Sequence, residues 1–132
     1  MPLERIQDLF RKLNPFKDAD PAASPSQRHD KIDLVGLDRQ RDRVILSIVE
    51  TRPWSDDDRT LFDLQEKLNT YIGYVEQGRL VADYPQTRGK TVEFRLQTAF
   101  PLRARDEEFI EEARREHLTP RGIEWKTEML KG

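Results

Sequence analysis

The segment "RVILSIVET", residues 43–51, constrains the fold more than any other part of this chain. Its apolar side chains fall on both faces of an extended backbone: Val44, Leu46 and Ile48 on one face, Ile45 and Val49 on the other. A strand that is apolar on both faces and rich in β-branched residues is typical of the centre of a sheet covered on both sides. Pro53 ends the strand because proline has no amide hydrogen for the ladder.

Three further segments are predicted to be strands of the same sheet. "KIDLVGL" at 31–37 precedes the polar run "DRQRD" at 38–42, and together with 43–51 they predict a β-hairpin. "TVEFRLQTAF" at 91–100 alternates most regularly, with a buried face and a solvated face. The buried face would hold Val92, Phe94, Leu96, Thr98 and Phe100, and the solvated face Glu93, Arg95 and Gln97. "IEWKTEM" at 123–129 is predicted to be the last strand.

Two amphipathic helices are predicted between these strands. The first has an apolar stripe at helical spacing, formed by Leu61, Leu64, Leu68, Tyr71, Ile72 and Val75. Gly78 follows it where a left-handed residue would end the helix, and residues 79–90 are predicted to form a return loop. The second runs from about Asp106 to Leu118. Its inner stripe would be Phe109, Ile110, Ala113 and His117, and a Glu111–Arg115 pair would support its outer face.

The order β-β-α-β-α-β predicts an α/β (α+β) fold, a two-layer sandwich built on a four-stranded mixed sheet. Because β-α-β crossovers are right-handed, both long helices should lie on one face of the sheet. Ile45 and Val49 would then lie on the opposite face, where something should cover them. We expect either the N-terminal helix or a second subunit to do so.

The acidic run Asp56-Asp57-Asp58 could be taken for a metal site or for the start of a helix. Ser55 is a preferred N-cap residue, and the aspartates would occupy the first helical positions, where the helix dipole favours negative charge. Successive side chains point about 100° apart around a helix, so three in a row do not chelate one ion. The run is therefore predicted to cap the helix.

The N-terminal residues differ in character from the rest of the chain. Residues 1–14 carry apolar side chains at helical spacing and predict an amphipathic helix. Residues 15–30 contain Pro15, Pro21 and Pro25 among small and polar residues and predict a flexible linker. Residues 31–132 are then expected to form a single α/β domain. For the tethered helix a protein contact is favoured over a membrane surface.

Composition excludes several classes of function. The 132 residues include 23 basic and 25 acidic side chains, so the net charge of -2 gives no field to hold a nucleic acid. The absence of cysteine excludes disulfides and thiolate chemistry and suits a reducing compartment. Without an apolar run of about 20 residues, no transmembrane segment is expected. A soluble cytoplasmic protein without a cofactor is the expectation.

Polar and aromatic side chains near the first long helix are the candidates for binding. Gln65 and Asn69 lie four residues apart at the border of its apolar stripe, where an amide usually bonds a neighbouring strand or loop. Trp54, Tyr74 and Tyr84 could form an aromatic patch near the helix ends and contact a partner. A second interpretation is that they fill the edges of the core.

The sharpest enzymatic alternative is a divalent-metal-dependent nuclease or phosphodiesterase core around Glu50. Asp33 or Asp38 would supply one carboxylate and Glu50-Thr51-Arg52 the next group, with magnesium held between them. Arg52 weakens this hypothesis because arginine does not give up its proton as lysine can. His117 is titratable, but spacing ties no nucleophile to it, and His29 lies in the linker.

From about Lys31 to Met129 the chain resembles a family of small bacterial proteins known only as a domain of unknown function. The resemblance rests on the hairpin, Trp54-Ser55, "LQEKLNTYIGYVEQG" at 64–78, "DYP" at 83–85, "GK" at 89–90 and "GIEW" at 122–125. It implies the same order of elements and adds no activity. The sequence therefore favours a non-catalytic protein-interaction module that forms a homodimer, with the metal-dependent core and an immunity- or inhibitor-type protein as alternatives.

Overall fold

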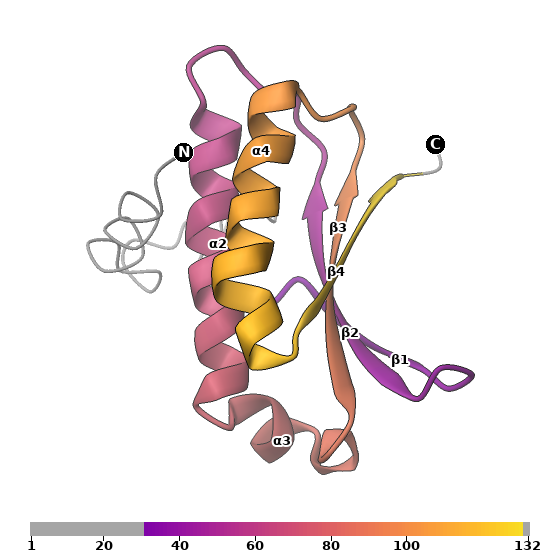
Figure 1. The fold of residues 1–132 in the computed structure, drawn as a ribbon. Helices are drawn as coiled ribbons and strands as arrows, with labels where there is room; N and C mark the ends of the chain where they lie inside the picture. The colour runs from indigo at the N-terminus through magenta and orange to yellow at the C-terminus, as the bar shows by residue number, and fades with distance from the viewer. Residues whose placement is uncertain (1–30, 131–132) are drawn as a thin grey trace.

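The computed structural model describes residues 31–130. Within that range a four-stranded mixed sheet is formed by β1 (Leu34–Asp38), β2 (Arg43–Glu50), β3 (Thr91–Thr98) and β4 (Glu124–Met129). The strands lie in the order β1-β2-β3-β4 (Figure 1). The β1–β2 hairpin is antiparallel, and β2–β3 and β3–β4 are parallel. The predicted α/β fold with a mixed sheet is confirmed, and the structure adds the strand order. The predicted N-terminal helix and linker lie outside the described residues.

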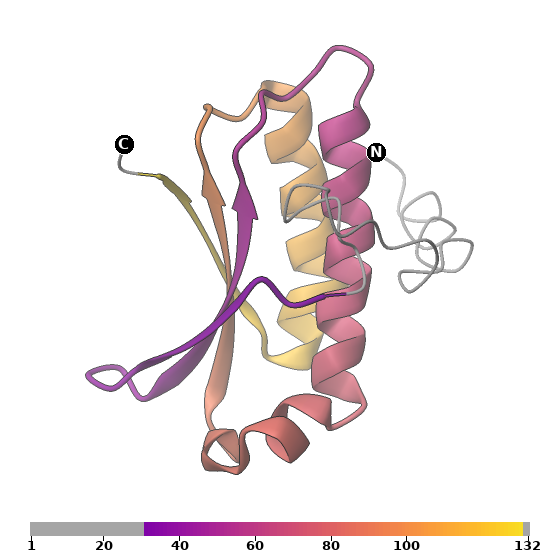
Figure 2. The same ribbon diagram turned by 180° about the vertical axis from the view of Figure 1, so that it is seen from behind.

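Two long helices, α2 (Arg59–Glu76) and α4 (Ala104–Ala113), lie side by side on one face of this sheet (Figures 1 and 2). The strand pattern explains why: Val44, Leu46 and Ile48 of β2 are fully buried against the helices, and they are in register with alternate residues of β3. Gly78 follows α2 in the left-handed conformation, with φ of 75°, as its position predicted.

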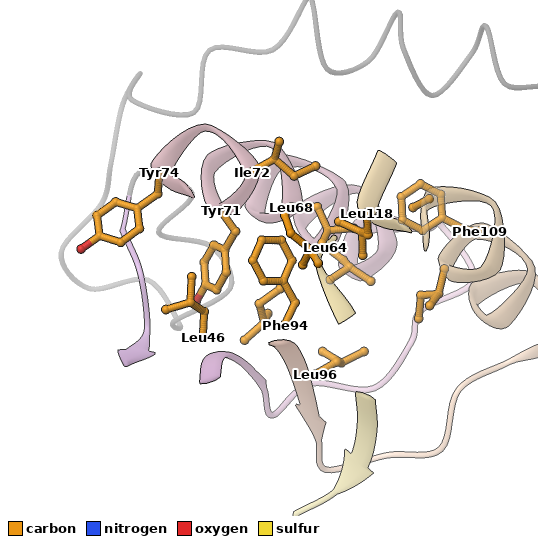
Figure 3. Close-up of a cluster of buried hydrophobic side chains, with 14 of the residues drawn as sticks. Leu46, Leu64, Leu68, Tyr71, Ile72, Tyr74, Phe94, Leu96, Phe109 and Leu118 are labelled. Atoms are coloured by element: carbon orange, nitrogen blue, oxygen red, sulfur yellow. The ribbon is translucent and has the colours of Figure 1, made fainter. Parts of the chain in front are cut away.

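The core fills the space between α2, α4 and the sheet (Figure 3). Tyr71 of α2 and Phe94 of β3 are each fully buried and meet edge to face, with ring centroids 5.6 Å apart. Such a contact contributes about 0.5–1.5 kcal/mol beyond the burial of area. Leu68 and Phe109 join the same cluster from the two helices. The predicted inner stripes of both helices are buried in this way, except that Val75 is only partly buried.

The start of α2 differs from the prediction. The N-cap is Asp58, in the left-handed conformation, rather than Ser55, and α2 begins at Arg59. Asp57 still serves a helix-end amide, because its Oδ1 accepts a hydrogen bond from Arg59 N at 3.0 Å. Asp58 instead forms ion pairs with Arg103 and Arg105 beside α4. Within the acidic run, Asp57 therefore stabilises the turn that enters α2, and Asp58 binds arginines at the start of α4. Local sequence rules do not reveal the second contact.

The second helical segment begins and ends differently from the prediction. α4 begins at Ala104, and Asp106 closes its first turn by accepting a hydrogen bond from Arg103 N at 2.9 Å. After Ala113 the chain continues as a π-helical segment (Arg114–Leu118), which is followed by a short 3-10 turn (Thr119–Arg121). Glu111 pairs with Arg114 rather than with Arg115, since Arg115 contacts Glu116.

Two loop and strand-end predictions were also wrong. The segment after Gly78 contains a short helix, α3 (Arg79–Asp83), and a 3-10 turn (Pro85–Thr87), where a return loop was expected. Phe100 is 42% exposed because β3 ends at Thr98, so Phe100 does not continue its buried face. No helix among residues 31–130 is long and apolar enough to cross a membrane.

Candidate functional site

Five charged side chains meet where β1 begins, β2 ends and α2 makes its first turns. We call them the buried charge cluster: Asp33, Glu50, Arg52, Asp63 and Lys67. Apart from Arg52, whose side chain is 23% exposed, each side chain is at most 5% exposed. Ionised groups are rarely buried unless they are paired, so this cluster needs a physical account.

Lys67 and Asp33 form the inner pair of the cluster. Lys67 Nζ lies 2.7 Å from Asp33 Oδ1 and donates a second hydrogen bond, also of 2.7 Å, to the carbonyl of Lys31. Asp33 Oδ2 accepts a hydrogen bond from Val49 N at 3.0 Å. Burial raises the pKa of Asp33, the ammonium of Lys67 opposes that rise, and the nearby charge of Glu50 adds to it. The pair fastens the start of β1 to the middle of α2.

Arg52 holds the outer two carboxylates of the cluster. Its Nη2 donates to Glu50 Oε1 at 3.0 Å and to Asp63 Oδ2 at 2.8 Å, and its Nε donates to Glu50 Oε2 at 3.1 Å. The amide of Arg52 also donates to Glu50 Oε2, at 2.9 Å. This forked contact is the geometry that a guanidinium offers to carboxylates. It binds the chain just after β2 to the second turn of α2.

The arrangement bears directly on the metal-dependent alternative. Asp33 and Glu50 both lie on the helix-facing side of the sheet, but each carboxylate is held by a cationic side chain. Among residues 31–130 no group of three histidine, cysteine, aspartate or glutamate side chains is placed to hold a metal ion. A magnesium ion at Glu50 would have to displace the guanidinium of Arg52. Asp38, the other carboxylate considered, accepts a hydrogen bond from Arg41 N in the hairpin.

Tyr71 extends the polar contacts of the cluster into the core. Its hydroxyl donates to the carbonyl of Ser47 and accepts a hydrogen bond from Asp33 N at 2.8 Å. Burial raises the pKa of Tyr71 well above its usual range, and the charge of Asp33 adds to the effect. The phenol therefore stays protonated, and it joins α2 to the sheet by donating to β2 and accepting from the residue before β1.

The binding candidates predicted around α2 have different surroundings. Gln65 is 5% exposed, and Asn69 is partly buried. Gln65 Oε1 is buried without a hydrogen-bond partner in the structure. Gln65 lies between Asp63 and Lys67 in a stretch of α2 whose residues are all buried. Its amide therefore does not face open solvent.

The three aromatic candidates do not come together. Trp54 is 7% exposed before α2, and its Nε1 donates to Thr98 Oγ1 at 3.2 Å. Tyr74 lies near the other end of α2, where its hydroxyl donates to Asp83 Oδ2 at 2.8 Å and Arg79 packs over its ring. Figure 3 shows Tyr74 pointing away from the cluster around Phe94. Tyr84 is 38% exposed. Trp54 is used at the core edge, which leaves Tyr84 as the exposed aromatic of the three.

His117 lies on the π-helical segment and is 8% exposed. Burial lowers the pKa of its imidazole, the positive charge of Arg121 lowers it further, and Glu116 opposes them. Its packing role, predicted from the inner stripe of the second helix, is confirmed by this burial. A hollow of about 380 Å³ lies nearby, lined by Arg114, Thr119, Gly122, Ile123, Glu124 and Trp125.

The other face of the sheet, which we call the open face, is covered by no described helix (Figures 1 and 2). Its residues are Leu34, Gly36, Asp38, Arg43, Ile45, Ser47, Val49, Thr91, Glu93, Arg95, Gln97, Glu124, Lys126 and Glu128. Ile45 and Val49 are partly buried, and Leu34 is 55% exposed. The predicted position of Ile45 and Val49 opposite the helices is therefore observed.

Glu93 on the open face is 2% exposed, although its strand pattern predicted a solvated side chain. Arginines surround it: Arg95 Nε donates to Glu93 Oε2 at 2.8 Å, and Arg43 Nη1 lies 3.4 Å from Glu93 Oε1. Arg43 Nη1 also donates to Glu124 Oε1 at 2.6 Å. These ion pairs cross three strands and fix the side chains of one half of the open face.

The fold is thus that of a two-layer α/β protein whose buried ionised groups are paired internally. A family model matches residues 25–131, and the chain belongs to this family, which is described as a family of unknown function (DUF6572). The resemblance predicted from the sequence is confirmed. Searches of curated proteins and of solved structures found no match.

Proposed function

We propose that this chain is a non-catalytic protein-interaction module that binds a partner through the open face. One observation carries this proposal: the partly buried side chains of Ile45 and Val49 lie next to the fixed ion pairs around Glu93 on the same face of the sheet. An apolar centre beside ordered charges is the usual anatomy of a protein interface. Ordering these side chains before binding reduces the entropy that association costs.

The buried charge cluster supports the non-catalytic part of the proposal. A general acid or base must reach a substrate, and a metal ligand must have free lone pairs. Lys67 and Asp33 are instead at most 5% exposed and are committed to each other and to backbone groups. Glu50 and Asp63 share one guanidinium. We assign these groups to holding β1, β2 and α2 together.

Affinity capture from the native host tests this proposal, with matched variants of the full chain as bait. Ile45→Lys and Val49→Lys each place a charge at the apolar centre, and at position 45 the new ammonium would face Glu93 across the strands. Gln77→Lys adds the same charge at the exposed end of α2 and serves as the control. We expect a protein that wild type and the control retain and that both open-face variants lose.

Circular dichroism and urea unfolding of the three variants ensure that the comparison concerns binding. A partner retained equally by all of them would place the interface elsewhere and contradict the proposal. The identity of the captured protein also separates the general module from the immunity- or inhibitor-type alternative, because an inhibitor would capture a toxin or an enzyme.

A further inference from the structure

The outer edge of β4 is an exposed edge of the described sheet. β4 pairs with β3 alone in the described sheet. Lys126 and Thr127 are exposed, and Met129 is 50% exposed. An exposed strand edge presents unpaired N–H and C=O groups, which another strand can satisfy.

The phase of the β3–β4 ladder shows which backbone groups of β4 face outward. Leu130 N donates to Thr98 O at 2.9 Å, so the even-numbered residues of β4 direct their backbone groups toward β3. Trp125, Thr127 and Met129 therefore direct theirs away from the sheet. Ile123 lies outside this set, because its amide already donates to Leu118 O at 3.0 Å.

We propose that β4 pairs antiparallel with β4 of a second copy, with the two Thr127 residues opposite each other on the twofold axis. In this register every outward amide and carbonyl of Trp125, Thr127 and Met129 finds a partner. The two four-stranded sheets then become one continuous sheet, with the helices of both copies on the same side.

The side chains favour this register over its neighbours. On the open face, Lys126 lies opposite Glu128 of the second copy, twice across the axis, and opposite charges stabilise a directly facing pair. On the helix-facing side, exposed Met129 lies opposite Trp125. A register centred on Lys126 would instead set Lys126 against Lys126 and Glu124 against Glu128. A register centred on Trp125 needs the amide of Ile123, which is already bonded.

The other sheet edge lacks these features. β1 is five residues long, with Gly36 at its centre, and self-pairing there would set Leu34 opposite Asp38. A single pair of short strands buries less area than a permanent dimer interface, so the β4 dimer should be reversible. It should form in the micromolar to millimolar range and not as an obligate assembly.

A unique cysteine tests the register, because the full chain has none. The Cα atoms of a hydrogen-bonded antiparallel pair lie about 5.5 Å apart, within disulfide range. Thr127→Cys should therefore oxidise to a covalent dimer at least ten-fold faster than Thr91→Cys, an exposed strand threonine outside this edge. Equal rates, or faster linkage of Lys126→Cys, would overturn the proposed register.

Sedimentation velocity over a concentration series tests the dimer itself. Thr127→Pro removes the outward amide and the hydroxyl that accepts from Trp125 Nε1 at 2.8 Å. Neither group bonds β3, so β3–β4 pairing should persist while self-association is lost. A chain that is monomeric at all concentrations overturns the inference, as does a dimer that Thr127→Pro leaves intact. The inference rests on the proposed function only in that both act through protein contacts. If the chain is a monomer that still captures a partner through Ile45, only the dimer inference is contradicted. If it forms the β4 dimer but captures no partner, only the proposed function is contradicted.

Discussion

Lys67 is the fully buried cation of the buried charge cluster. Its side chain is 0% exposed, and its ammonium contacts both Asp33 and the carbonyl of Lys31. Removing one partner of a buried ion pair leaves an uncompensated charge, which costs far more than the intact pair contributes.

We expect Lys67→Met to lower the free energy of unfolding by about 3–5 kcal/mol, because Asp33 would remain buried without its cation. Adding Asp33→Asn should recover part of that loss, since the amide oxygen can still accept from Val49 N. Lys90→Met removes a partly exposed lysine paired with exposed Asp42 and should cost less than about 1 kcal/mol. Urea unfolding measures all three. Losses that simply add in the double variant would show that the two groups do not act as a pair.

We expect His117 to make the stability of the folded chain depend on pH. Burial lowers the pKa of its imidazole, so the unfolded chain binds the proton more readily than the folded chain does. The stability from His117 is therefore fully present above its ordinary pKa of about 6.5 and is lost as the pH falls below it. Thermal unfolding from about pH 8 to pH 5.5 should show a fall in wild type that His117→Gln reduces. An equal fall in both would contradict this assignment.

For single residues, the sequence predicted which apolar side chains are buried better than it predicted which charged side chains form ion pairs. Leu64, Leu68 and Tyr71 follow from helical spacing. Nothing in the spacing indicates that Lys67, on the same helix, pairs with Asp33 from 34 positions earlier in the chain, because that contact depends on how β1 is placed. Glu93 was missed for the same reason: its arginine partners come from the hairpin as well as from β3.

Arg103 makes most of the contacts that join the starts of α2 and α4. Arg103 donates to Ser55 O at 2.8 Å, to Asp58 Oδ1 at 2.9 Å and to both carboxylate oxygens of Asp106. Asp106 is fully buried. The acidic run before α2 is thereby tied to the helix beside it.

Arg103→Ala should destabilise the chain by about 1–3 kcal/mol, because Asp106 would lose its charged partner while buried. Arg105→Ala removes the other arginine that contacts Asp58, but its side chain is 62% exposed, so the loss should be much smaller. Amide hydrogen exchange should also show faster exchange at the start of α2 in Arg103→Ala alone. Similar effects from both arginines would mean that surface charge, not the buried contact, matters here.

Elements with a long periodic pattern were predictable, and their ends were not. The β-branched run of residues 43–50, the alternation of residues 91–98 and the stripe of α2 identify these elements, because each pattern extends over the whole element. The start of α2 moved to Arg59 because Asp58 takes a left-handed conformation and pairs with α4, which overrides the local preference for Ser55 as N-cap. The π-helical segment after α4 carries no such periodic signal.

For the whole molecule, the order of elements implied both helices on one face but left the strand order open. The sheet order places β2 and β3 at the centre, where both neighbours are strands, and leaves β1 and β4 as edges. The central position of residues 43–50 agrees with their apolar character on both faces. Which edges and which face the described helices leave uncovered is a property of the assembled sheet, and so no single segment could reveal it.

The central claim is that the carboxylates of the buried charge cluster, Asp33, Glu50 and Asp63, hold the fold together and do not bind a catalytic metal. Amide NMR spectra of the full chain titrated with Mn²⁺ test it most directly, because a bound paramagnetic ion broadens nearby signals. The account predicts no saturable broadening around Val49–Arg52 and Asp63, with or without competing Mg²⁺. Saturable broadening centred on Glu50 and relieved by Mg²⁺ would contradict it and favour the metal-dependent alternative.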